Sequence, residues 1–173
     1  MFKLFRSWKD ENEGMAAVEA AMIFPIMLSM LLAIYDLGNG ILANQKAVRA
    51  SQVVADLIAR QGIVDDAMIS EAIEAGRLAF EPLDSSSYGV DIVSIRFDEN
   101  ENTEILWRET MNMPSLPDAY TAVAPLQDAN EGVVMVSVRY VYVPMFSAVV
   151  TDDIVMGEVA FSRGRSSPAI TRQ

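Results

Sequence analysis

The sequence contains neither histidine nor cysteine among its 173 residues. Without histidine, the chain has no imidazole for acid–base catalysis, for a Ser-His-Asp triad or for metal binding. Without cysteine, it has no thiol nucleophile, no cysteine zinc site and no disulfide. We therefore expect a protein that is not an enzyme and that needs no cofactor and no metal.

Basic residues are also few. The chain has 13 Lys and Arg residues against 24 Asp and Glu residues, a net charge of −11. Such an acidic chain repels phosphate backbones, so we expect no nucleic-acid partner. The charge is unevenly placed, because residues 38–173 hold 10 basic and 19 acidic residues and carry −9 of it. Hydrophobic residues make up 51% of the chain, which excludes a disordered protein.

One long stretch, residues 15–35, is almost free of charge, with Glu19 as its sole charged residue. As a helix this stretch spans about 30 Å, the hydrocarbon thickness of a bilayer. It is apolar on all sides, unlike a core helix, and no small-residue cleavage site follows it. We predict a membrane span over about residues 15–37, from which the C-terminal body is exported.

Two residues of this stretch are unusual in a plain anchor. A carboxylate costs about 2.5–3.5 kcal/mol at the centre of a span and less near its end. Glu19 lies about one turn inside, so it is either a tolerated edge charge or a functional residue. Pro25 removes a backbone hydrogen bond, and we expect a helix kink there. Gly14 ends a short leader, residues 1–14, and Glu19 is the fifth residue after it.

The N-terminal residues resemble the TadE-like proteins of tight-adherence (Flp) pilus systems, which are type IV pilus systems. The similarity covers roughly residues 10–60 and rests on Gly14-Met15-Ala16-Ala17-Val18-Glu19-Ala20-Ala21, then Pro25, then Tyr35-Asp36-Leu37-Gly38. The resemblance implies a minor pseudopilin that a prepilin peptidase cuts between Gly14 and Met15, with Glu19 acting in recognition or packing. Its implied partners are membrane lipid, the peptidase and other pilins and pseudopilins. Its implied location is the bacterial inner membrane, single-pass, with a periplasmic C-terminal domain, whether or not it later enters the extracellular pilus.

Cleavage would expose an α-ammonium group on Met15, about 6 Å along the helix axis from Glu19. In a neighbouring subunit displaced by about one turn, this ammonium could face Glu19, and pairing would relieve two costly charges. Two alternatives remain open. One is an uncleaved single-pass scaffold protein of the envelope secretion machinery, and the other is a membrane-tethered periplasmic enzyme.

We predict an α+β, pilin-like fold in which one long N-terminal helix, residues 15–60, packs on a small antiparallel sheet within an exported domain, residues 61–173. The helix continues beyond the span with a 3.6-residue apolar period at Ile41, Ala47, Val48, Ser51, Val54, Ala55 and Ile58. The patterns further predict a second helix that Asp65 or Asp66 caps and that reaches Phe80. Alternating residues predict strands at 90–98, 104–110, 133–143 and 154–162.

Two further segments have two interpretations each. Residues 98–109 place oxygen ligands at alternate positions, as in a calcium loop, but Thr103 stands where that loop needs glycine. Strands also flank the segment, so a solvated hairpin turn is the favoured interpretation. The basic tail from Arg163 to Arg172 is either a frayed end or a contact with anionic lipid or an acidic partner.

Overall fold

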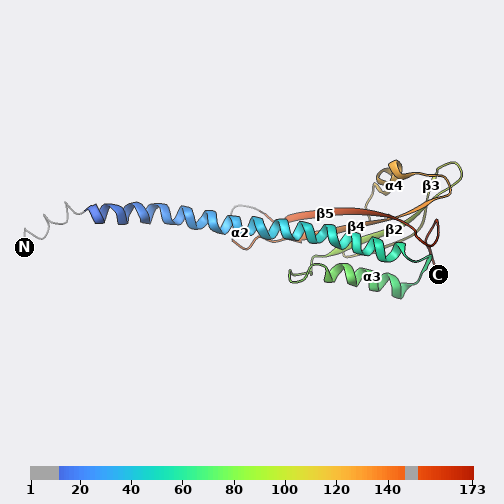
Figure 1. Cartoon of the computed structure of the whole chain (residues 1–173), viewed down its shortest axis with the longest axis horizontal. Helices are drawn as coiled ribbons and strands as arrows, with labels where there is room; N and C mark the ends of the chain where they lie inside the picture. Colours follow the sequence, from blue (N-terminus) through green and yellow to red (C-terminus); the bar gives the residue numbers. More distant parts are fainter. Residues whose placement is uncertain (1–11, 147–151) are drawn as a thin grey trace, which may run out of the picture.

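A single helix of 48 residues, α2 (Asn12–Ala59), runs along the molecule, and the described residues that follow it pack on its C-terminal half (Figure 1). The computed structural model describes residues 12–146 and 152–173. After α2 follow β1 (Ile63–Val64), α3 (Asp66–Leu78), β2 (Gly89–Phe97), β3 (Thr103–Met111), α4 (Ala119–Val123), η1 (Ala124–Leu126), β4 (Gly132–Tyr142), β5 (Ile154–Arg163) and β6 (Thr171–Arg172).

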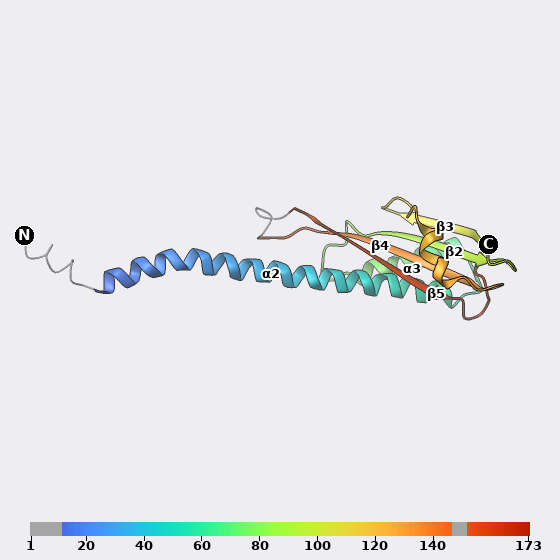
Figure 2. The same ribbon diagram turned by 90° about the horizontal axis from the view of Figure 1, so that it is seen from above.

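Strands β2 to β5 form one antiparallel sheet in the order β3-β2-β4-β5. Helices α2 and α3 cover one face of it, and α4 with η1 covers part of the other (Figures 1 and 2). Side chains alternate across a strand, so β4 contributes to both layers. Val134 and Val136 pack under α2 and α3, whereas Val133 and Met135 pack under α4. The predicted α+β class, a long N-terminal helix on a small antiparallel sheet, is confirmed.

The face of α2 that packs on the sheet consists mainly of small residues. Ala43, Ala47 and Ala50 are fully buried, and Val54 and Ile58 extend this face. The predicted stripe was wrong at Ile41, which is 53% exposed. The small side chains of the alanines let the α2 backbone approach β4 and β5 closely. A count of apolar residues at helical spacing gives alanine too little weight, so it does not identify this face correctly.

The second predicted helix and the strands are confirmed with shifts of a few residues at their ends. Asp65 caps α3, because its carboxylate accepts a hydrogen bond from the Met68 amide at 2.8 Å. The segment between β3 and β4 holds two short helical pieces, α4 and η1, where we expected a loop with one turn of helix.

The basic tail is not a frayed end. Ile170 is 2% exposed, and its carbonyl accepts hydrogen bonds from Ser94 Oγ at 2.7 Å and from Trp107 Nε1 at 2.8 Å. The last strand, β6, pairs in parallel with β1. Arg165 contacts Asp56 of α2, and Arg172 bridges acidic groups of α3 and β3, so the tail basic groups bind acidic residues of their own chain.

Helices α2 and α3 approach each other closely at Gly76. A Cβ on Gly76 would overlap the Tyr88 hydroxyl and lie 2.6 Å from Val54 Cγ2. The Tyr88 hydroxyl is buried and has no hydrogen-bond partner among the described residues, and burial raises its pKa.

We therefore expect Gly76→Ala to lower the free energy of unfolding by about 1–3 kcal/mol, because overpacking pushes the helices apart. Tyr88→Phe removes the obstructing, unpaired hydroxyl but leaves the overlap with Val54, so the double variant should regain part of this loss. Urea unfolding of the full chain in detergent micelles, followed by circular dichroism, measures both. A double variant as unstable as Gly76→Ala alone would contradict this explanation.

Candidate functional site: the projecting helix and its junction with the body

The N-terminal half of α2 projects beyond the body and carries a continuous apolar surface (Figure 1). Gly14–Ala59 is long and apolar enough to cross a membrane, by length and composition, and none of its most apolar window is buried. The exposed large side chains lie on every side of the helix, and they are Met15, Val18, Met22, Ile23, Phe24, Ile26, Met27, Leu28, Met30, Leu31, Ile34 and Tyr35. The composition of the span was thus predictable, and the structure adds that the body leaves it uncovered.

Four predicted site residues lie on this projecting half: Gly14, Met15, Glu19 and Pro25. Glu19 is exposed, and among residues 12–146 and 152–173 no ion pair reaches its carboxylate. Met15 and Glu19 lie one helical turn apart on one continuous helix. The helix continues past Pro25, and Ser29 donates its hydroxyl to the Ile26 carbonyl at 2.8 Å. Most of the predicted leader, residues 1–11, lies outside the described residues.

The body meets the helix at Tyr35 and Asp36, at the end of the apolar stretch. Asp36 is 3% exposed, and its carboxylate accepts hydrogen bonds from the Met145 amide at 3.0 Å and the Phe146 amide at 2.8 Å. The preceding residue, Tyr35, packs edge to face on Phe146 with ring centroids 5.6 Å apart. Two adjacent residues of α2 thus hold the end of β4 against the helix.

Tyr142, the last residue of β4, completes this junction. Its hydroxyl donates to the Asp36 carbonyl at 3.0 Å, and its ring faces Gly40, where a Cβ would lie 3.5 Å away. Burial, and then the charge of Asp36, raises the pKa of the Tyr142 hydroxyl. Beside the junction, α2 and β5 line a groove of about 930 Å³ with mostly apolar walls, including Leu37 and Ile154.

The calcium-like segment is a hairpin turn between β2 and β3. The Asp98 carboxylate accepts hydrogen bonds from the amides of Asn100 and Asn102 and from the Asn102 side chain, and the Asn102 bonds lower the pKa of Asp98 most. These bonds use the oxygens that a cation would need. In the part of the chain that the structure describes, no cluster of acidic side chains is arranged to hold a metal ion.

Sequence reasoning missed the role of Asp36. An acidic residue at the end of a span is also typical of an ordinary interfacial charge, and its partners are about 110 residues away in the chain. The one available signal was that Asp36 belongs to Tyr35-Asp36-Leu37-Gly38, one of the segments on which the family resemblance rests.

The family model described as TadE-like protein matches residues 14–56. No curated protein and no solved structure matches the chain. The matched segment contains the exposed apolar surface, Glu19, Pro25 and the Asp36 junction, and it excludes the body from residue 61 onwards. The family associates the chain with tight-adherence pili. Over residues 14–56 this chain is similar to TadE-like proteins, as its motifs indicated.

Proposed function

We propose that this protein is a minor pseudopilin of a tight-adherence (Flp) pilus that acts through helix packing and not through chemistry. In this proposal it is anchored in the bacterial inner membrane by one span, with residues 61–173 in the periplasm. The observation that carries the proposal is the projecting half of α2, which is apolar on every side and uncovered. Such a surface is costly in water and is stable only among lipid tails or other apolar helices.

An all-round apolar helix suits both environments of a pilus subunit. In the bilayer its surface faces lipid, and in an assembly it faces the helices of neighbouring subunits. The rigid connection of this helix to a folded body lets helix packing position the body. The proposed partners are accordingly membrane lipid, the prepilin peptidase and the other pilins and pseudopilins of the system.

Glu19 supplies specificity in this proposal. Its carboxylate has no ion pair within the described chain, and in an apolar surrounding it is costly without one. The proposed partner is the α-ammonium group that cleavage before Met15 creates on an adjacent subunit. The pair selects one register between two helices, because other registers leave both charges unpaired.

The helical conformation around Gly14 favours one alternative function. The Gly14–Met15 bond lies in the first turn of α2, which begins at Asn12, whereas a protease generally binds an extended segment. An uncleaved single-pass scaffold protein of the envelope machinery would keep this helix intact. Glycine lowers the stability of a helix by about 0.5–1 kcal/mol relative to alanine, so local unwinding at Gly14 is nevertheless inexpensive.

Intact-mass measurement of the chain, purified from cells that contain the prepilin peptidase, tests the proposal. We expect a mature chain that begins at Met15. Glu19→Ala should abolish either the cleavage, if Glu19 acts in recognition, or the co-purification with other pilins, if it acts in packing. Ser29→Ala is the matched control within the same span and should change neither.

A full-length chain in the presence of active peptidase would favour the scaffold protein instead. A Glu19→Ala variant that is processed and assembled normally would show that Glu19 is only a tolerated charge at the edge of the span.

A further inference from the structure

Strands β4 and β5 form a hairpin, and large apolar side chains are exposed at the end of it that contacts α2 near Asp36. These side chains are separate from those of the projecting helix. We define the hairpin end as residues 142–146, from the last residue of β4 onwards, and residues 154–155 at the start of β5. Its exposed members are Val143 (62% exposed), Met145 (72%), Phe146 (43%), Ile154 (42%) and Val155 (58%). A soluble domain seldom exposes so many neighbouring apolar side chains without a partner. We propose that the hairpin end is a second membrane contact, which lies in the lipid surface beside the span.

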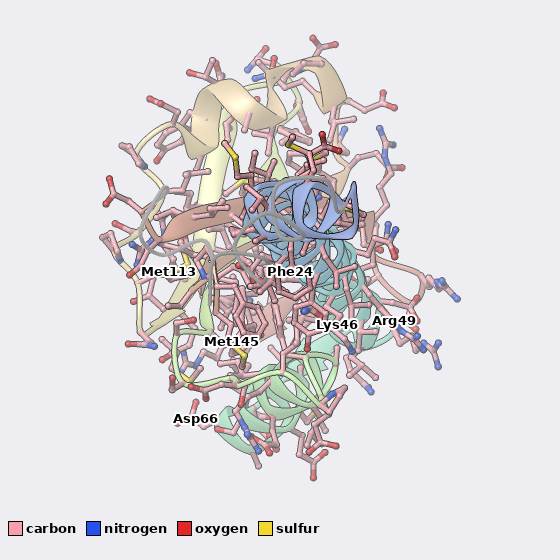
Figure 3. The ribbon with its side chains drawn as sticks, turned by 90° about the vertical axis from the view of Figure 1, so that its left-hand side faces the viewer. Phe24, Lys46, Arg49, Asp66, Met113 and Met145 are labelled. Atoms are coloured by element: carbon pink, nitrogen blue, oxygen red, sulfur yellow. The ribbon has the colours of Figure 1, made fainter. Side chains whose placement is uncertain are left out.

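The position of the hairpin end along α2 supports this proposal. Residues 15–35, which form the apolar stretch, are about 30 Å long, so Tyr35 lies where the hydrocarbon layer ends. Asp36 holds the amides of Met145 and Phe146 at this same level. Figure 3, which looks along α2 from its N-terminal end, shows Met145 below the projecting helix.

The rest of the described body stands further from the membrane. Lys46 donates hydrogen bonds to the carbonyls of Ala79 and Glu81 at the end of α3, so α3 ends about 15 Å beyond Asp36 along the helix. Among the described elements, the end of β4 and the start of β5 lie nearest to the projecting half of α2 (Figures 1 and 2). The apolar side chains of the hairpin end are thus next to lipid, and the interfacial zone is several ångströms deep.

The composition of the hairpin end fits lipid through apolar contact and not through charge. The aromatic pair Tyr35–Phe146 lies at the level where aromatic side chains favour a membrane interface. Asp152 and Asp153, directly before β5, are exposed and would repel anionic headgroups. We therefore expect the contact to form in zwitterionic bilayers and to need no anionic lipid.

Because the natural chain has no cysteine, a single introduced cysteine can carry a fluorescent probe at a defined place. The inference rests on the membrane span of the proposed function, so the experiment includes a probe in the span. We would label Met145→Cys, the span variant Met27→Cys and the matched control Val159→Cys with an environment-sensitive dye. Val159 is also an exposed apolar residue (42%), but it lies further along β5 from the junction. Val143→Cys is a second reporter should Met145→Cys fold poorly.

Each full-length variant is reconstituted in phosphatidylcholine nanodiscs, with or without lipid that carries a quencher near the headgroup. We expect the dyes at residues 27 and 145 to lose fluorescence to the lipid quencher and the dye at 159 to be quenched by aqueous iodide. Lipid quenching at 27 with iodide quenching at 145 would overturn the inference and leave the span intact. Protection of residue 145 from both quenchers would also overturn it, in favour of a protein partner. A dye at residue 27 that stays in water would overturn the span and the inference together.

Discussion

Replacing Arg108 with alanine is expected to lower the free energy of unfolding by about 3–5 kcal/mol, the largest loss that we predict for the body. Arg108 of β3 donates from Nε to Asp91 Oδ1 at 2.8 Å, and Asp91 of β2 is fully buried. Asp91 also accepts the Leu116 amide, and Arg108 donates to the Leu116 carbonyl, so the pair ties the segment after β3 to the sheet. This hydrogen bonding with Asp91 raises the pKa of Arg108. Without Arg108, a buried carboxylate is left without its counter-charge.

A matched control lies on the neighbouring strand. Arg96 pairs with Glu104, but both side chains are about half exposed, and such pairs contribute about 0–1 kcal/mol. Arg96→Ala should therefore change the urea midpoint of the full chain in micelles very little. The double variant Asp91→Leu/Arg108→Met should recover only part of the loss, because apolar residues replace the buried pair but the Leu116 amide and carbonyl lose their partners. Equal effects of Arg108→Ala and Arg96→Ala would show that Asp91 is well solvated without its partner.

The second large effect is expected at the junction, where Asp36→Ala should release the hairpin end from α2. The carboxylate accepts two backbone amides, and a hydrogen bond to a charged group contributes about 1.5–3 kcal/mol. We expect the amides of Met145 and Phe146 to exchange with deuterium about a hundredfold faster or more, since two such bonds are lost. Peptide-level exchange of the full chain in nanodiscs measures this directly.

Asp56→Ala is the control for this experiment, because Asp56 is another acidic residue of α2. Asp56 pairs with Arg60 and Arg165 at the other end of the body, in contacts that are largely exposed. Its loss should leave exchange at the hairpin end unchanged. If Asp36→Ala also leaves it unchanged, the aromatic contact of Tyr35 with Phe146 is sufficient to hold the hairpin end.

The candidate site was only partly accessible from the sequence. Glu19 and Pro25 stand out because a charge and a proline are rare in an apolar stretch, and neither needs a distant partner to be noticed. Asp36 and Asp91 do not stand out, because an acidic residue at a span end or in a strand is equally typical of a solvated surface. Only contacts with residues far along the chain distinguish these two.

The same reason applies to the C-terminal tail, for which the sequence left two interpretations open. Its basic and small residues are typical of a frayed end, but Ile170 is buried and its carbonyl accepts two hydrogen bonds. One apolar side chain among polar neighbours shows no periodicity, so the sequence pattern contains no sign of this contact.

The sequence alone determined the apolar length of the span, the α+β class and the TadE-like motif. These features depend on local quantities: the transfer free energy of successive side chains, and the two periods that distinguish a strand from a helix. The tertiary structure decided that α2 and the sheet leave half of the helix uncovered, and that Asp36 holds the hairpin end at the level where the apolar stretch ends. It also decided where the buried charges find partners. Those features depend on contacts between residues about 20 to 110 positions apart, which the folded chain brings together and no local pattern encodes.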